Sequence, residues 1–436
     1  MRWPFWRKSD AVANEFPSER TPVPGRVVTG PQQAGPAGSV QPHPSFQRVT
    51  FMDRSVSLFP DVTVLPPSAS SAAIEDFAFK LFKILSRSDA LKNLFFSPAS
   101  IMWCLGMIHE LATGETQKEI AEAIAIAGEG RNSKDVFALL KEAFRSRNEL
   151  ELLFANSLWC GIRSSIRPEC TERLREDFQT EFYRVDFAKS EAADRINSWV
   201  NEKTHGRISR IVDQFFSPTA LVALNAVYFK GSWREPFKAK FTREGNFTTG
   251  AGNRKPVKMM RRHDTFLYYE EERFQAVSLP YRGGMAMYVI LPRPKISPQE
   301  FQEALNAETW RTWLGQFESV KGTIELPKFD VDYSSDLTPA LGALGMRRAF
   351  DLGAAELDGI QVERSPVWVD QIQHWAVTRV NEEGTEAAAV TRMGAVLGLD
   401  SHARTFQMVV ERPFFLAIVD QRTRAIAFIG WIDDPK

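Results

Sequence analysis

The amino-acid sequence predicts an α+β fold with several β-sheets, and two observations support this class. Amphipathic patterns with helical spacing dominate residues 71 to about 202, whereas short strand-like segments between glycine, proline and charged turns dominate the C-terminal half. Helices first and strands later are typical of α+β domains rather than of alternating βαβ units. With 436 residues, of which 44% are apolar and 25% charged, the chain can bury one large core.

Each predicted element follows from its apolar spacing. Ile74, Phe77, Leu81 and Leu85 fall on one face of a first helix. The other predicted helices are residues 101–112, with apolar positions 101, 105, 108 and 112, and residues 192–202. The predicted strands are residues 266–269, 286–291, 323–331, 414–419 and 425–431. Asp-Gln-Arg-Thr-Arg joins the last two strands, which predicts a buried hairpin.

Residues 1–70 differ from the rest of the chain. They hold eleven of the 25 prolines and lack a periodic apolar face. Such a segment cannot offset the entropy of ordering, so we expect a mostly disordered extension before a domain at residues 71–436. Residues 49–65 have some strand character and could dock on the domain.

Composition excludes several classes of partner. The formal net charge is zero, with 54 basic and 54 acidic residues, so no overall field favours nucleic acid or an anionic membrane surface. No run of eighteen apolar residues predicts a membrane-spanning helix. The N-terminal sequence Met-Arg-Trp-Pro-Phe-Trp-Arg-Lys is followed by polar residues and is a poor secretory signal.

Motifs for catalysis or metal binding are missing from the sequence. It contains no Gly-x-Ser-x-Gly, no phosphate-binding glycine-rich loop and no Cys-x-x-Cys. His109-Glu110 begins like a zinc-protease helix, but Thr113 occupies the position of the second histidine. We therefore expect no catalytic residues, no cofactor and no metal site.

Three cysteines are too few for a disulfide framework. Cys104 lies in an apolar helical stretch, and we expect it to pack as a small apolar residue. Cys160 and Cys170 could pair across a loop, but free thiols are the favoured interpretation.

The most informative segment is residues 381–391, Asn-Glu-Glu-Gly-Thr-Glu-Ala-Ala-Ala-Val-Thr. If it forms a strand, positions 385, 387, 389 and 391 make one small, uncharged face, while the other face can carry charge into solvent. Such a segment could enter between existing strands without a steric or desolvation penalty, and Gly384 would supply the hinge. Glutamate and alanine also favour helices, so the segment on its own could equally be a helical turn.

The chain from about residue 72 to its C-terminus resembles the serpin family through a series of sequence blocks. These blocks are residues 93–101, 114–116, 224–233, 257–260, 279–281, 291–292, 326–329, 380–389 and 412–415. One such match alone is weak, whereas the whole series in the family's order argues against chance.

The resemblance implies a fold of several helices around three β-sheets, with an exposed reactive-centre loop at about residues 382–405. It implies an inhibitor rather than an enzyme. A target protease would attack the loop as its substrate, and the cleaved loop would then enter the central sheet as a new strand before the acyl-enzyme is hydrolysed. The implied partner is a protease held covalently by a monomeric inhibitor. The implied location is the extracellular space, although the N-terminal sequence leaves an intracellular location open.

The resemblance assigns the hinge of this loop to Glu382, Glu383, Gly384, Thr385, Glu386, Ala387, Ala388 and Ala389. No proline, charge or large side chain occupies the inward positions before Met393. A charge there would have to be buried unpaired, and a proline would remove a hydrogen-bond donor. The pattern therefore favours an inserting inhibitor, with a non-inhibitory serpin-like binding protein as the alternative.

Two counts place the reactive bond differently. Counting forward from Gly384 gives Gly398–Leu399, which we prefer, whereas counting back from Pro413 gives a position nearer His402. The neighbouring candidates are Leu397, Asp400 and Ser401.

Each position predicts a different target protease. A leucine at 397 or 399 suits a chymotrypsin- or elastase-like serine protease with an apolar pocket. Asp400 suits an aspartate-directed protease and keeps a cysteine-protease inhibitor as an alternative. Arg404 suits a trypsin-like enzyme.

Two supporting clusters are also implied by the resemblance. The shutter, below the point where the sheet opens, consists of Ser100, Asn225 and His374. Its hydrogen bonds would hold the sheet closed. The breach, where the loop first enters the sheet, consists of Trp233, Lys328 and Glu382. Lys328 and Glu382 are expected to form an ion pair that anchors the hinge.

Overall fold

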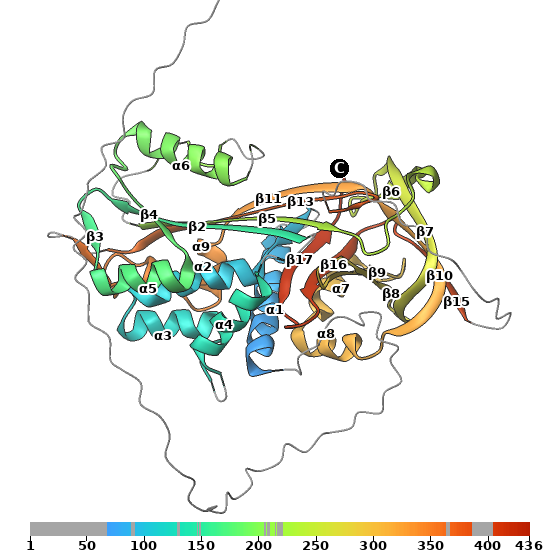
Figure 1. The fold of residues 1–436 in the computed structure, drawn as a ribbon, viewed down its shortest axis with the longest axis horizontal. Coiled ribbons are helices and arrows are strands. Elements are labelled where there is room, and N and C mark those ends of the chain that lie inside the picture. Colours follow the sequence, from blue (N-terminus) through green and yellow to red (C-terminus); the bar gives the residue numbers. More distant parts are fainter. Residues whose placement is uncertain are drawn as a thin grey trace, which may run out of the picture. The chain divides into compact units, whose positions relative to one another are not determined.

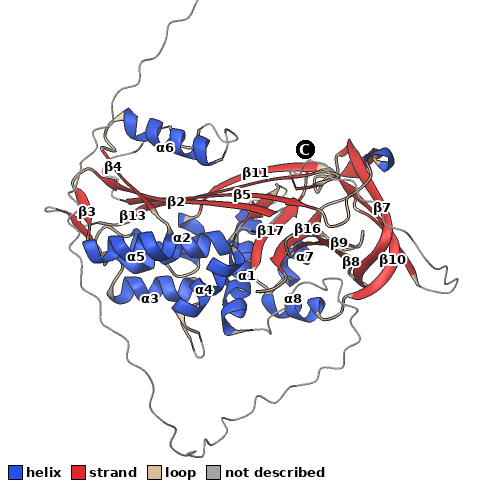
Figure 2. Ribbon diagram, in the orientation of Figure 1, coloured by secondary structure: helices blue, strands red, loops and turns tan. Residues whose placement is uncertain are grey.

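The computed structural model describes residues 68–88, 92–128, 131–145, 147, 150–204, 206, 210–213, 215, 221–362, 367–385 and 404–436. Within these residues the chain forms nine α-helices and three β-sheets (Figures 1 and 2). The predicted α+β class, with helices around three sheets, is confirmed. The expected N-terminal extension lies almost entirely outside the described residues.

The helices are α1 (Ala69–Ser88), α2 (Pro98–Leu111), α3 (Gly114–Ala123), α4 (Ser133–Ala143), α5 (Pro168–Phe178), α6 (Ser190–Lys203), α7 (Pro298–Ala304), α8 (Ala307–Leu314) and α9 (Thr338–Ala343). The strands of the N-terminal half are β1 (Leu94–Phe96), β2 (Leu150–Gly161), β3 (Ser164–Ile166), β4 (Glu181–Val185), β5 (Leu221–Ser232), β6 (Arg243–Thr248) and β7 (Arg254–Glu271). The remaining strands are β8 (Phe274–Pro280), β9 (Met285–Pro292), β10 (Glu318–Pro327), β11 (Phe329–Asp336), β12 (Ile360–Val362), β13 (Val369–Val380), β14 (Gly384–Thr385), β15 (Thr405–Val409), β16 (Phe414–Asp420) and β17 (Ile426–Ile432).

The first sheet has six strands in the order β11-β13-β14-β5-β2-β4. Its centre is buried on both faces, with α6 on one side and α2 on the other (Figure 1). Along β5, Val222 and Leu224 pack in the cluster that contains α6, whereas Ala223 and Phe229 pack in the main core. Burial on both faces explains why β5 is almost continuously apolar.

The second sheet has nine strands in the order β1-β17-β16-β9-β8-β7-β10-β15, with β6 paired to β7. The predicted hairpin is confirmed, because β16 and β17 pair antiparallel from Phe414 opposite Ile432 onward. At the far end, the short strand β15 pairs in parallel with β10. A third, two-stranded sheet consists of β3 and β12.

The predicted single strand at residues 323–331 is wrong. The chain forms two strands here, and they belong to different sheets: β10 pairs with β7, and β11 pairs with β13. Pro327 ends β10 because it has no N–H to donate to a ladder. The next residue, Lys328, donates its N–H to the carbonyl of Lys258 at 2.8 Å. Apolar positions alternate on both sides of the turn, at residues 324 and 326 and again at 329 and 331, with a shift of one residue across Pro327 and Lys328. The sequence therefore marks a break, but it does not reveal that the two halves join different sheets.

The three predicted helices are confirmed with small shifts of their ends. The second begins at Pro98 rather than residue 101, because Ser97 caps it. The Ser97 side chain accepts a hydrogen bond from the N–H of Ser100, and Pro98 occupies the first turn, where its missing donor costs nothing.

All three cysteines are buried and free, so Cys160 and Cys170 do not pair in the structure. Burial raises the pKa of the Cys104 and Cys160 thiols to about 12. Cys104 is 0% exposed, as expected for a residue that packs as a small apolar group.

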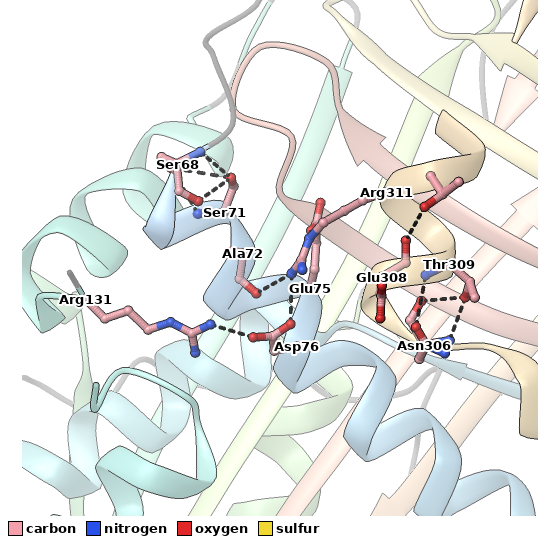
Figure 3. Close-up of polar contacts among 11 residues, drawn as sticks. Ser68, Ser71, Ala72, Glu75, Asp76, Arg131, Asn306, Glu308, Thr309 and Arg311 are labelled. Atoms are coloured by element: carbon pink, nitrogen blue, oxygen red, sulfur yellow. Dashed lines mark hydrogen bonds and ion pairs between the residues drawn. The ribbon is translucent and has the colours of Figure 1, made fainter. Parts of the chain in front are cut away.

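A charged cluster joins α1 to α8 and to the segment before α4 (Figure 3). We call it the α1–α8 cluster; it consists of Glu75, Asp76, Arg131 and Arg311. The Arg311 guanidinium donates through Nε to Glu75 and through a terminal nitrogen to Asp76 at 2.8 Å. Arg131 approaches the other oxygen of Asp76 at 2.5 Å. Each buried or half-buried carboxylate thus has a guanidinium partner.

Candidate functional site

A two-residue strand, β14, lies between the ends of β13 and β5 in the six-stranded sheet. Thr385 is paired with Val380 on β13 and with Gly231 on β5. Below this point the two long strands pair directly with each other, from Val369 to Val377 on β13. After β13 the chain therefore turns back and forms β14 between the ends of β13 and β5, where these two strands separate. Residues 386–403 lie outside the described residues.

Gly384 can be replaced by no other residue type without strain. Its φ of +151° is a conformation that side chains with a Cβ rarely adopt. A Cβ placed there would lie 2.1 Å from the carbonyl oxygen of Gly231. The predicted hinge glycine thus stands where the backbone turns and where a side chain would collide with the backbone of residues 231–233.

The side chain of Thr385 is held inside the protein. It is 0% exposed, and its Oγ1 lies 2.8 Å from the hydroxyl of Tyr281, which is also buried. Burial raises the pKa of Tyr281, so this phenol stays protonated. Trp233 stacks on the Tyr281 ring with centroids 4.3 Å apart and planes 12° apart.

Backbone contacts hold the turn before β14. The N–H of Trp233 donates to the carbonyl of Glu383, and the N–H of Phe237 donates to the carbonyl of Glu382. The indole Nε1 of Trp233 donates to the carbonyl of Asn381 at 2.9 Å. Trp233, predicted for the breach, thus contacts the hinge through both its backbone and its side chain.

The expected ion pair between Lys328 and Glu382 is present. The two charged atoms lie 2.9 Å apart, and the hydroxyl of Thr242 donates to the other oxygen of Glu382 at 2.8 Å. Burial opposes ionisation of this carboxyl, but the hydrogen bonds from Lys328 and Thr242 outweigh burial and lower the pKa of Glu382. Glu382 is consequently ionised and bonded from two sides.

Ser100, Asn225 and His374, predicted for the shutter, lie together and are all 0% exposed. The Asn225 amide donates to Oγ of Ser100 at 2.6 Å, and its oxygen lies 2.6 Å from Nδ1 of His374. The N–H of Ser97 approaches Nε2 of His374 at 3.2 Å, which makes Nε2 the acceptor and Nδ1 the protonated nitrogen. Burial lowers the pKa of His374 to about 3, so the imidazole is neutral.

Sequence reasoning missed Tyr281, Thr242, Ser97 and Asn156 as parts of these clusters. Asn156 lies on β2 directly opposite Asn225, and its side-chain oxygen accepts a second hydrogen bond from the Asn225 amide at 2.5 Å. A lone asparagine inside an apolar strand was the available signal for Asn156. Tyr281 and Thr242 could not be found in this way, because their partners, Thr385 and Glu382, lie more than 100 residues away in the sequence.

The candidate reactive bond, Gly398–Leu399, and its neighbours Leu397, Asp400 and Ser401 lie outside the described residues, as do the hinge positions Glu386, Ala387, Ala388 and Ala389. On the far side of this gap, Arg404 precedes β15. Its guanidinium contacts Glu270 at 2.6 Å, and Arg293 contacts the other oxygen of Glu270 at 2.7 Å. Phe406 stacks on Tyr268 with centroids 3.9 Å apart.

The described residues contain no group of three or more His, Cys, Asp or Glu side chains arranged to hold a metal ion. In the same part of the chain, none of the helices is both long and apolar enough to span a membrane. His109, considered for zinc on sequence grounds, lies beside Glu110 at 3.9 Å.

Comparison with known proteins agrees with this geometry. The family model Serpin (serine protease inhibitor) matches residues 72–435. Human Serpin B8 is 34% identical over 369 residues, which cover 82% of this chain and 97% of that protein.

Solved structures agree with the sequence match. The native-state structure of tengpin, a thermophilic serpin, superposes with a TM-score of 0.76 at 25% identity, covering 86% of this chain and 96% of that one. Human thyroxine-binding globulin superposes with a TM-score of 0.74 at 25% identity, covering 84% of this chain and 98% of that one. Sequence, fold and the order of the strands around β14 lead to one conclusion: this chain belongs to the serpin family.

Proposed function

We propose that this protein inhibits proteases, of the serine class, as a suicide substrate whose cleaved loop enters the six-stranded sheet between β5 and β13. The observation that carries this proposal is the position of Thr385. It is buried as the last residue of the two-residue strand β14, at the point where β5 and β13 separate. A loop that continues from this residue needs only the separation of two strands to extend β14.

The sequence after Thr385 supports continued insertion. If the alternation set by buried Thr385 continues in the inserted form, positions 387, 389 and 391 face inward, and they are Ala, Ala and Thr. Arg392 has the opposite parity and would face outward. No proline follows before residue 400, so each residue can donate to the ladder.

The energy available is large enough to distort a bound protease. One backbone hydrogen bond contributes about 1 kcal/mol net, so a new strand of ten residues contributes on the order of 10 kcal/mol. This is comparable with the total stability of many domains, about 5–15 kcal/mol. The proposed inhibitor would thus hold its protease as a covalent acyl-enzyme, acting once and as a monomer.

Side chains near the proposed bond favour an apolar-pocket protease. Leu397 and Leu399 flank Gly398 in the sequence, and either would suit a chymotrypsin- or elastase-like enzyme. Arg404, the residue that would suit a trypsin-like enzyme, is already paired with Glu270 at the start of β15. Asp400 keeps a cysteine-protease target as the alternative.

A second candidate is a serpin-like binding protein that does not trap proteases. The fold match to thyroxine-binding globulin, a carrier by its name, favours this candidate. The two functions differ in what happens after the loop is cut, and one experiment separates them.

That experiment incubates the protein with chymotrypsin, pancreatic elastase, trypsin and an aspartate-directed cysteine protease. We expect a covalent complex that survives hot detergent with chymotrypsin or elastase, together with release of a C-terminal peptide whose first residue identifies the cut bond. That residue is Leu399 for a cut at Gly398–Leu399, and Gly398 or Asp400 if Leu397 or Leu399 fills the apolar pocket. A matched control uses each protease with its active-site nucleophile already blocked, which should give no complex. Cleavage of the loop by every enzyme, with full protease activity afterwards, would contradict the inhibitor and support the binding protein.

A further inference from the structure

We propose that Asn246 is an N-glycosylation site and that the folded protein carries the glycan on the exposed face of β6. Asn246-Phe247-Thr248 is the one Asn-x-Ser/Thr triplet in the 436 residues, and its middle residue is not proline. Because the triplet is unique, an N-linked glycan on this chain has a single possible position.

The strand presents the two required groups to solvent. Asn246 and Thr248 are exposed, whereas Phe247 between them is 0% exposed and packs against Phe414. Successive side chains of a strand point to opposite faces, so the acceptor amide and the hydroxyl two residues later share the outer face. This is the arrangement that a glycan needs in the folded protein.

Modification would break no contact among the described residues. Neither the Asn246 amide nor the Thr248 hydroxyl makes a hydrogen bond to another described residue, although most neighbouring polar groups do. The backbone is held independently, since the N–H of Thr248 donates to the carbonyl of Glu411 at 2.8 Å. A glycan on Asn246 therefore replaces water rather than a protein partner.

The surroundings leave space for an oligosaccharide. On β7, the residues opposite Asn246 and Thr248 are Pro256 and Arg254, and both are exposed. In the part of the chain that the structure describes, β7 is the one strand that pairs with β6, and the other edge of β6 has no partner strand beyond the bond from Thr248 to Glu411. An unpaired edge invites association with other chains, and a bulky hydrated group beside it would oppose that association.

The chemistry is a group transfer from a lipid-linked oligosaccharide pyrophosphate, the donor used in secretory compartments. The Asn246 amide nitrogen forms a bond to the anomeric carbon of the first sugar. The bond from that carbon to the lipid pyrophosphate oxygen breaks, the leaving pyrophosphate keeps the electron pair, and the amide nitrogen loses one proton. The product is a neutral glycosyl amide, and nothing is oxidised or reduced.

The glycan would lie away from the hinge contacts. Thr242, whose hydroxyl bonds Glu382, precedes Asn246 by four residues, which corresponds to about 13 Å along an extended chain. Protease trapping should consequently be the same with and without the glycan, so this inference can be tested whether or not the proposed function holds.

The test expresses the full chain behind a cleavable signal peptide in a secreting eukaryotic cell. We expect one glycan on the secreted protein, and its enzymatic release in ¹⁸O-labelled water should convert Asn246 into labelled aspartate. A matched pair isolates the hydroxyl: Thr248→Ser should keep the glycan, whereas Thr248→Val and Asn246→Gln should lose it.

Two results would overturn the proposal. The first is secreted wild-type protein with the mass of the polypeptide alone, when other glycoproteins of the same cells are fully occupied. The second is a glycosylated protein whose melting temperature rises by several degrees after enzymatic deglycosylation, because that would mean that the fold does not accommodate the glycan.

Discussion

The hydroxyl of Tyr281 lies 2.8 Å from Oγ1 of Thr385, and neither residue is more than 1% exposed. This contact connects Thr385, the last residue of β14, to an aromatic stack formed by Tyr281 and Trp233. The start of the proposed reactive loop is therefore tied to the protein interior in this structure.

Tyr281→Phe should lower the free energy of unfolding by about 1–3 kcal/mol, because the Thr385 hydroxyl would remain buried without its partner. Thr385→Val should have a similar effect, since the tyrosine hydroxyl then loses its partner. Removing both groups should cost less than the sum, with a coupling of about 1 kcal/mol between the two sites. Urea unfolding of the four proteins measures this cycle. Additive effects of the two substitutions would contradict a direct contact.

Thr385→Arg should convert the proposed inhibitor into a substrate. A guanidinium at this fully buried position would lie in the sheet without a partner, at a cost of several kcal/mol. Insertion would slow, and deacylation would release active protease. The measurement is the number of inhibitor molecules consumed per protease inactivated, which should rise at least tenfold.

Thr405→Arg is the matched control for this change, because Thr405 is exposed on β15. The control should trap protease as the wild type does. If Thr385→Arg also traps protease normally, the insertion mechanism is wrong.

The stability of the protein should fall as the pH decreases below about 6.5, in part because of His374. Burial lowers the pKa of His374 to about 3 in the folded state, whereas the unfolded chain binds the proton near the ordinary value of 6.5. Between pH 3 and pH 6.5 the unfolded state thus binds more protons than the folded state. The contribution of neutral His374 to stability is therefore fully present above pH 6.5 and is lost as the pH falls towards 3. From pH 7 to pH 5 this one group should cost about 2 kcal/mol.

Urea unfolding at both pH values checks this expectation. His374→Gln should reduce the pH dependence, because it removes the group whose pKa is lowered by burial. An identical pH dependence in wild type and His374→Gln would contradict the prediction.

The α1–α8 cluster should contribute to stability mainly by neutralising Glu75. Burial raises the pKa of Glu75, and Arg311 opposes this shift (Figure 3). Arg311→Met removes the cation and should cost about 2 kcal/mol, less than the 3–5 kcal/mol typical of fully buried pairs, because Arg311 is partly exposed.

Combining Arg311→Met with Glu75→Gln removes the uncompensated charge and should recover part of the loss. Thermal unfolding at pH 7 measures both variants. A double variant that is no more stable than Arg311→Met alone would show that Arg311 acts through packing and not through its charge.

Several structural features could be predicted from the local sequence pattern alone. Helical spacing located α1, α2 and α6, because an amphipathic helix needs its apolar face whatever it packs against. The β16–β17 hairpin could be found since its pairing is local. Gly384 could be singled out because the need for positive φ is a property of one residue and its turn.

The features that the sequence did not predict depend on contacts between segments that lie far apart in the chain. The chain changes sheets at Lys328. Pro327 signals a break there, but not that the two halves join different sheets, because the partner strands β7 and β13 select each half. Asn156 joins Asn225 through the register of β2 and β5, and Tyr281 reaches Thr385 across 104 residues of sequence. Periodicity reports which side of an element is buried, whereas the identity of the atoms on the other side follows only from tertiary packing.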